Sequence, residues 1–500
     1  MRFLRPAIVL CLVGVSFSAA SPAAQSLPPA TLTLGVQPPA GMLASAFTVD
    51  RDRNVYYAGT TTDPAFPTTA GAYSRRCGVD GQCGQQFFSR RLSDMVVVKL
   101  GRDGQIQLST FLGGDGQLTA RFVALGPDGS VYVAGEFAES RLIAGPQRMP
   151  FANPSVPSCG QNDRFVARLD PERFSLIYWT CIQGSTPVPA PITMFGLAVD
   201  GKGSAIVGGY VNNANFPLVG ALPPFQRRPG LHGYIKKLLA NGDIAFSTIY
   251  GGSEFDTLWS LAVDRGGNIY IAGDSQSGDL PATRPFQSTR NGPTDGFLAK
   301  VDPDGRTLLY STYLGGSSTD VIWGVAVDHN DEAWVVGDTH SVDFPTTSDA
   351  TRSTSLCAGD PGCAQRNPSA FAARFDAVGR LRYSTLIGPN SFNPGNPGGA
   401  RLNDVRIGAQ NELYLFGGSA PVMTPVRPLT TPPCVEFCGQ ALIIGPLGDV
   451  RFTSAIPSGN SVLSFEGPEA RGRWALGPDG ELYFLRSAFP FTSSELIVVK

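Results

Sequence analysis

Residues 261–272 (LAVDRGGNIYIA) and 296–316 (GFLAKVDPDGRTLLYSTYLGG) each contain two short apolar segments joined by a turn. In the first stretch the segments flank Asp264 and a glycine pair, and glycine tolerates the left-handed backbone of a tight hairpin turn. In the second stretch the run Asp302–Gly305 (DPDG) turns the chain, and residues 308–314 return. Together the two stretches predict four consecutive antiparallel strands.

The same unit recurs along the chain when copies are aligned on the residue that ends the first apolar run. The residues one and three positions before this anchor are apolar in every copy, and the third residue after it is nearly always one that tolerates a left-handed backbone. The anchors, which are 64 to 80 residues apart, are Asp50, Gly126, Asp200, Asp264, Asp328, Gly408 and Gly477. Radial repetition of four-stranded sheets is the blade geometry of a β-propeller, so seven copies predict seven blades.

The two ends of the chain complete one blade between them. Residues 496–500 (LIVVK) align with residues 95–99 (MVVVK), so the seventh unit ends after its third strand. Residues 31–35 (TLTLG) align with a fourth strand, and the segment near residues 30–36 is expected to close the last blade and protect its edges. The predicted fold class is therefore all-β: a single domain over residues 25–500 forming a seven-bladed β-propeller of four-stranded antiparallel blades.

Residues 1–24 are predicted to be a secretory signal peptide. Two arginines precede an apolar, small-residue segment over residues 7–20, and small residues suited to cleavage follow. The apolar run is shorter than the roughly 20 residues that span a bilayer, and no later segment reaches that length. We expect an exported protein, in the periplasm, on the cell surface or outside the cell, with no membrane span after signal removal.

The cysteines indicate an oxidising compartment. Of nine, Cys11 lies in the predicted signal peptide, and the other eight fall into local couples without a C-x-x-C motif or a neighbouring histidine. In an exported chain this pattern predicts disulfides and no metal site. The couples are Cys77 with Cys83, Cys159 with Cys181, Cys357 with Cys363, and Cys434 with Cys438.

The charge pattern and the missing motifs exclude several functions. A formal net charge of -2 without charged runs provides no field for nucleic acid or anionic membranes. Three histidines, no G-x-S-x-G and no calcium-loop or phosphate-loop motif leave no predicted catalytic residue. We expect a monomer without a cofactor.

Residues 261–272 and 296–316 resemble the SBBP family of β-propeller repeats, which occur in exported bacterial proteins. The resemblance covers about residues 30–500 and is closest in the fourth and fifth units. It implies a seven-bladed propeller at the cell surface or outside the cell. It implies no reaction, because the repeat motifs are scaffold residues.

One group of residues suggests a ligand site. Phe195, Trp259 and Trp323 occupy one column, just before the first strand of three consecutive units, and Asp256 and Asp320 lie three residues earlier in the last two. With this strand innermost, the column would lie at a mouth of the central channel, where aromatic faces beside carboxylates suit a sugar or peptide. The competing interpretation, which we favour, is structural: the aromatic side chains wedge between blades and the aspartates cap turns.

Three functional hypotheses follow. The first is a non-enzymatic scaffold that binds a glycan or an extracellular protein through loops on one face. The second is a polysaccharide-acting hydrolase or lyase that uses the carboxylates at the channel mouth. The third is a structural cell-surface protein without a specific ligand. We prefer the scaffold over the enzyme.

Overall fold

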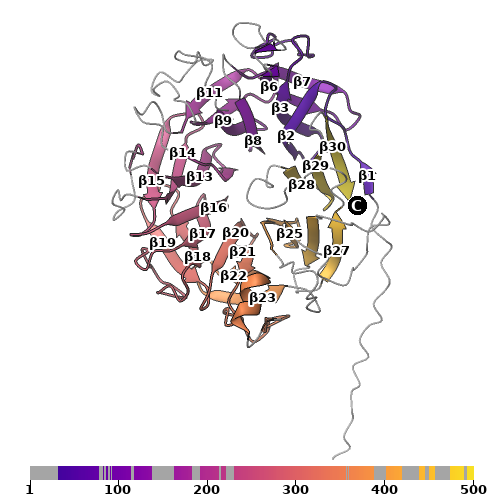
Figure 1. Ribbon diagram of the computed structural model, residues 1–500. Helices are drawn as coiled ribbons and strands as arrows, with labels where there is room; N and C mark the ends of the chain where they lie inside the picture. Colours follow the sequence, from indigo (N-terminus) through magenta and orange to yellow (C-terminus); the bar gives the residue numbers. More distant parts are fainter. Residues whose placement is uncertain are drawn as a thin grey trace, which may run out of the picture.

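The computed structural model describes residues 32–77, 83, 86–87, 90–91, 93–113, 118–137, 163–182, 192–212, 216–220, 230–355, 357, 360–387, 401–418, 439–444, 450–456, 473–488 and 493–499. Within these residues the chain forms seven four-stranded antiparallel sheets, one two-stranded hairpin and one short helix. The sheets are arranged as blades around a central channel (Figure 1). The predicted seven-bladed β-propeller is confirmed.

In blades 1 to 6 the strands form a meander and pair in chain order, with the first strand innermost. In blade 7 the N-terminal strand takes the outermost place. Blade 1 comprises β2 (Met42–Val49), β3 (Val55–Thr61), β6 (Asp94–Leu100) and β7 (Ile106–Phe111). Blade 2 comprises β8 (Leu118–Leu125), β9 (Val131–Phe137), β10 (Arg164–Leu169) and β11 (Leu176–Cys181). Blade 3 comprises β12 (Gly196–Val199), β13 (Ala205–Val211), β14 (His232–Leu238) and β15 (Ile244–Tyr250). Blade 4 comprises β16 (Asp256–Val263), β17 (Ile269–Ser275), β18 (Asp295–Val301) and β19 (Leu308–Leu314). Blade 5 comprises β20 (Asp320–Val327), β21 (Ala333–Thr339), β22 (Ser369–Phe375) and β23 (Leu381–Ile387). Blade 6 comprises β24 (Asp404–Ile407), β25 (Leu413–Gly418), β26 (Gly439–Ile444) and β27 (Val450–Ile456). Blade 7 comprises β28 (Trp474–Leu476), β29 (Leu482–Ala488), β30 (Ser493–Val499) and β1 (Leu32–Leu34). The hairpin is β4 (Gln86–Phe87) with β5 (Arg90–Arg91), and the helix is α1 (Pro361–Arg366).

The N-terminal strand closes the ring, as the sequence predicts. Strand β1 pairs antiparallel with β30, with Leu32 opposite Val499 and Leu34 opposite Ile497. Beyond β1, the amide of Gly35 donates to the carbonyl of Leu496 at 2.9 Å, so the pairing continues one residue further. Figure 1 shows the two strands side by side at the outer edge of blade 7.

The turn between the first two strands explains the repeat columns. The third residue after each anchor has a positive φ in all seven blades: Arg53, Gly129, Gly203, Gly267, Asp331, Asn411 and Gly480. In blade 4 the anchor Asp264 accepts hydrogen bonds from the amide and side chain of Asn268 at 2.8 and 2.7 Å. The anchor aspartate therefore caps the turn, and the interpretation of this column as a hairpin turn is confirmed.

Apolar packing and tyrosine hydrogen bonds hold neighbouring blades together. Ile206 and Ile235 of blade 3 pack with Leu258 of blade 4, and all three are fully buried. Burying each such side chain stabilises the fold by about 1.5–3 kcal/mol. The hydroxyl of Tyr270 in blade 4 donates to the carbonyl of Asp331 in blade 5 at 3.1 Å. Each blade therefore depends on the next for its buried surface.

Two of the predicted disulfides are present, Cys77–Cys83 and Cys357–Cys363. Cys181 is buried at the end of β11, and Cys159, Cys434 and Cys438 lie outside the described residues, as does the predicted signal peptide. Among the described residues, no helix has the length and apolar character needed to cross a membrane.

Candidate functional site

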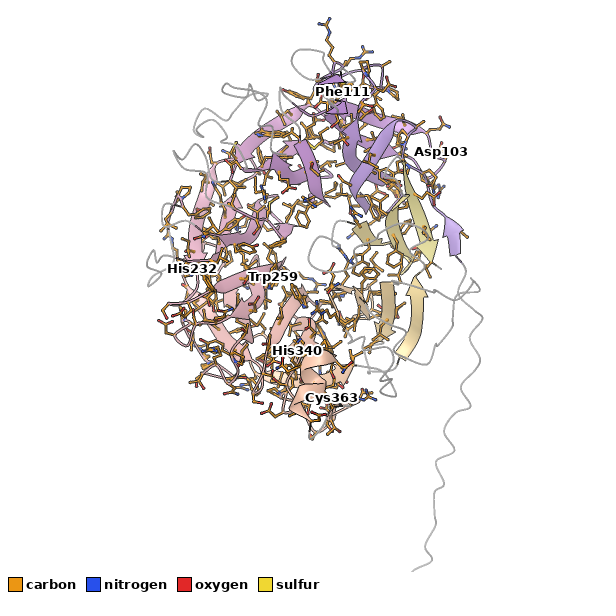
Figure 2. All side chains as sticks on the ribbon, viewed as in Figure 1. Asp103, Phe111, His232, Trp259, His340 and Cys363 are labelled. Atoms are coloured by element: carbon orange, nitrogen blue, oxygen red, sulfur yellow. A yellow bond between two sulfur atoms is a disulfide. The ribbon has the colours of Figure 1, made fainter. Side chains whose placement is uncertain are left out.

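The innermost strands of blades 4 and 5 each contain a β-bulge that sets the direction of one tryptophan. The pairing of β16 with β17 shifts between Leu258 and Ser260, which leaves Trp259 as the extra residue. Trp323 has the same place where β20 and β21 shift register. A bulge re-aims the side chain it carries, and Figure 2 shows Trp259 at the inner edge of the ring.

Four aromatic rings form a continuous row across blades 3 to 5, which we call the aromatic arc: Tyr210, Phe195, Trp259 and Trp323. The ring centroids of Phe195 and Trp259 are 4.9 Å apart, and those of Trp259 and Trp323 are also 4.9 Å apart. Tyr210 lies 5.6 Å from Phe195 and 5.8 Å from Trp259. All four side chains are partly exposed. The structure therefore brings together the three aromatic residues that the sequence singled out.

Carboxylates on the second strand of blades 4 and 5 hold the two indoles in place. Trp259 Nε1 donates a short hydrogen bond to Asp274, and Trp323 Nε1 donates one to Asp338. Burial raises the pKa of Asp274 to about 6, against the opposing effect of the hydrogen bond from Trp259. Neither carboxylate was predicted. In both blades the tryptophan and its aspartate are 15 residues apart, and Phe195 and Tyr210 have the same separation. From this constant spacing the two aspartates could have been predicted.

Two basic side chains lie beside Asp338. Arg401 Nε lies 3.7 Å from one carboxylate oxygen, and His340 Nε2 lies 3.6 Å from the other. Burial raises the pKa of Asp338, and the Arg401 guanidinium opposes this shift. The residue is only 2% exposed. His340 Nδ1 is in turn 3.1 Å from the carbonyl of Gln365 in α1, so the disulfide-linked segment around α1 lies beside this end of the arc.

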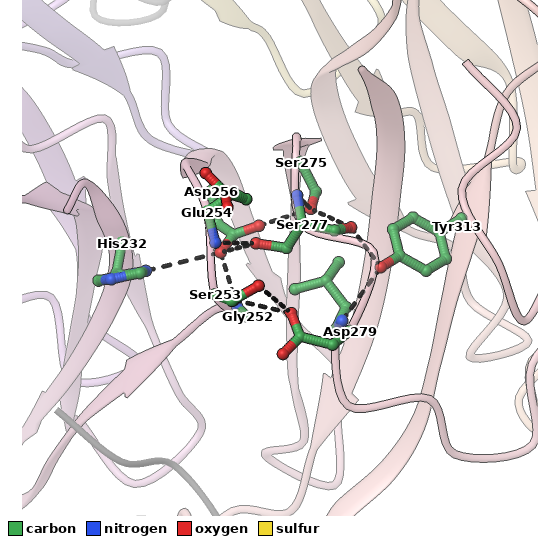
Figure 3. Close-up of polar contacts among 10 residues, drawn as sticks. His232, Gly252, Ser253, Glu254, Asp256, Ser275, Ser277, Asp279 and Tyr313 are labelled. Carbon is green, nitrogen blue, oxygen red and sulfur yellow. Dashed lines mark hydrogen bonds and ion pairs between the residues drawn. The ribbon is translucent and has the colours of Figure 1, made fainter. Parts of the chain in front are cut away.

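Asp256, one of the two predicted carboxylates, lies among polar side chains and a backbone amide at the start of blade 4 (Figure 3). It is fully buried and accepts hydrogen bonds from the amide of Gly252 at 2.6 Å and the hydroxyl of Ser277 at 2.9 Å. Ser275 Oγ lies 2.5 Å from its other oxygen, and His232 Nδ1 is 3.5 Å away. These contacts organise the connection into blade 4, and a ligand-binding role for Asp256 stays a prediction.

Asp320 occupies the equivalent place in blade 5 and is also fully buried. It accepts hydrogen bonds from the amide of Gly316 and the hydroxyl of Ser341, both at 2.8 Å. Burial raises the pKa of Asp320 to about 7, and the nearby charge of Asp295 adds to the shift. Its role in ligand binding likewise stays a prediction.

The equivalent bulge positions in blades 1 and 2 are polar. In blade 2 the bulge residue is Arg121, whose guanidinium lies 2.5 Å from Glu136. Arg164 contacts the same carboxylate at 3.1 Å. In blade 1 the bulge residue is Ser45, which donates to the carbonyl of Ala120 at 2.8 Å. The same backbone position therefore carries an ion pair, a hydroxyl or an aromatic ring in different blades.

The arc adjoins a cavity of about 880 Å³ in the central channel, lined by the innermost strands of all seven blades. Phe195 belongs to both the arc and the cavity wall, which combines apolar residues such as Val263 and Val327 with charged ones such as Asp404 and Arg406. Among the described residues, no group of three or more His, Cys, Asp or Glu side chains could hold a metal ion.

No family model matches the sequence, and no curated protein matches it. Of the solved structures, the β-propeller domain of the Trilobed protease from Pyrococcus furiosus is 8% identical, with a TM-score of 0.42 over 92% of this chain and 97% of that one. A chain of the Mitotic Checkpoint Complex is 10% identical, with a TM-score of 0.42 and 98% of both chains covered. YCF48 bound to D1 peptide is 10% identical, with a TM-score of 0.35 and 95% of both chains covered. At these TM-scores the likenesses carry no argument, and the fold assignment rests on the sheets of this chain.

Proposed function

We propose that this chain is an exported, non-enzymatic β-propeller of the SBBP-repeat type that binds a glycan on the aromatic arc. The observation that carries the proposal is the row of four partly exposed rings in contact across three blades. The two disulfides support an oxidising location outside the cytoplasm.

The arc suits a sugar for physical reasons. The apolar faces of a pyranose ring stack on aromatic side chains, while its hydroxyls need polar partners at the edge of the stack. Thr257, which pairs with Asp274 across the strands, provides such a partner beside the rings. The bulges and the Trp–Asp hydrogen bonds hold the indoles before a ligand arrives, so little side-chain entropy is lost on binding.

We do not carry the hydrolase or lyase hypothesis forward. Its catalytic candidates, Asp256 and Asp320, are fully buried and accept hydrogen bonds from their own connecting segments. No contact of either carboxylate favours a reaction over a structural role.

The proposal is tested by screening the purified protein against an array of glycans, followed by calorimetry and an assay for released products. We expect saturable binding without turnover. Trp259→Ala and Trp323→Ala should each weaken it about tenfold or more, because each removes a stacking surface. Phe286→Ala is the control, since Phe286 is 44% exposed and follows a segment bridged to the outermost strand β19. Absence of glycan binding, or unchanged affinity in both tryptophan variants, would contradict the proposal.

A further inference from the structure

The two carboxylates that accept hydrogen bonds from the indoles differ in the basic side chains near them. Asp338 has Arg401 and His340 within 3.7 Å. Within the part of the chain that the structure describes, no lysine, arginine or histidine forms an ion pair with Asp274. The charge neighbour that influences it is another carboxylate, Asp256. The blade 4 end of the arc therefore has excess negative charge.

Asp274 is also the more accessible of the two. It is partly exposed, whereas Asp338 is covered by the side chains around it. A carboxylate that is partly withdrawn from water without a cation costs free energy, and a cationic ligand would recover that cost.

The rings beside Asp274 add to the same preference. Trp259 donates to this carboxylate, and Tyr210 lies 5.8 Å from Trp259 in an edge-on arrangement. Aromatic faces carry negative potential and attract ammonium groups, with tryptophan the strongest. Ring face and carboxylate thus favour a positive charge at one point of the arc.

We propose that the glycan bound on the aromatic arc contains a free amino sugar, whose protonated amine lies over Trp259 and beside Asp274. This inference rests on the proposed function and defines its ligand class. An N-acetylated sugar offers the same stacking face without the charge, and the Asp274 carboxylate would repel a uronic acid.

The test compares a β-linked glucosamine tetrasaccharide with its fully N-acetylated counterpart by calorimetry at neutral pH. We expect the free amine form to bind the wild-type protein about tenfold more tightly. Asp274→Asn should remove this advantage, because the asparagine oxygen still accepts from Trp259 but the side chain carries no negative charge. Asp304→Asn removes the same charge from an exposed turn of the same blade and should preserve the advantage.

The outcomes separate this inference from the proposed function. If both sugars bind equally and Trp259→Ala weakens both, the amine preference is wrong and glycan binding stands. If neither sugar nor any other glycan binds, both fall. Salt titration of the wild-type protein needs no variant: the amine advantage should decrease as salt is raised, and a salt-independent advantage would overturn the inference.

Discussion

Blades 4 and 5 share one polar framework but differ in the charges within it. In both, an aspartate at the start of the innermost strand, Asp256 or Asp320, accepts from a glycine amide and a serine hydroxyl. The facing residue from the preceding blade is His232 in the first case and Asp295 in the second. A Cβ added to Gly251 would lie 2.6 Å from Asp256 and 2.8 Å from His232, and one added to Gly315 would lie 2.5 Å from Asp295 and 2.8 Å from Asp320, so the positions correspond.

This difference shows which features are common to the repeats and which vary between blades. The backbone and hydrogen bonds of the framework are reproduced, while the titratable partner changes from a base to an acid. The same holds at the arc, where one indole-bound carboxylate has two basic neighbours and the other has none among the described residues. Geometry is therefore a property of the repeat, and electrostatics a property of each blade.

The largest expected effect is on stability at neutral pH. Asp256→Ala should lower the free energy of unfolding by about 3–5 kcal/mol, because it removes the acceptor of buried donors and the carboxylate beside His232. Asp320→Ala should lower it by only about 1–2 kcal/mol, because it also removes a carboxylate that burial and Asp295 disfavour. Urea denaturation measures both. Equal losses would show that the two junctions are energetically the same.

A smaller effect should appear in the pH dependence of stability. The pKa of Asp320 is about 7 in the folded protein, above its ordinary value of 3.8, so the folded state binds a proton more tightly than the unfolded state. Its contribution is complete below about pH 4 and is lost as the pH rises from there through 7, with about 2–3 kcal/mol of the loss between pH 5 and 8.

Asp320→Asn should flatten this decline in denaturation curves recorded across that range. Asp304→Asn, on an exposed turn, should keep it. A profile unchanged by Asp320→Asn would mean that Asp295 and Asp320 do not form the acid pair that distinguishes blade 5.

The smallest effect concerns the arc. Arg401→Ala removes a partly exposed guanidinium from Asp338 and makes the blade 5 carboxylate resemble Asp274. Affinity for the glucosamine tetrasaccharide should rise about two- to threefold, in keeping with the modest strength of an exposed ion pair. Calorimetry measures the change, and unchanged or weaker binding would show that the two carboxylates are not equivalent.

The fold could be predicted because each repeat column has one physical cause. Gly267 tolerates the positive φ of the hairpin, and Asp264 caps it, so the strands on either side follow. The closing strand was visible because residues 31–35 resemble a fourth strand without a third before it.

The site could be predicted only in part. The aromatic column could be predicted, because its members lie at the same sequence separation from their anchors. Asp256 and Trp259, however, are three residues apart, and side chains alternate along a strand, so such residues take opposite faces. The bulge between Leu258 and Ser260 then decides where Trp259 points, and no residue type marks it. The partner Asp274 comes from another strand, whose register depends on that bulge.

The pairing of β1 with β30 also has a consequence for assembly. Gln37 donates to the carbonyl of Leu496, 459 residues later in the chain, at 3.0 Å. During synthesis β1 is made long before its partner β30, so blade 7 cannot be completed until residues 493–499 are available for pairing. Blades made earlier can pack on one another meanwhile, but the ends of that incomplete stack present unpaired strands that can aggregate. Pairing of β1 with β30 is therefore the step that ends this vulnerability.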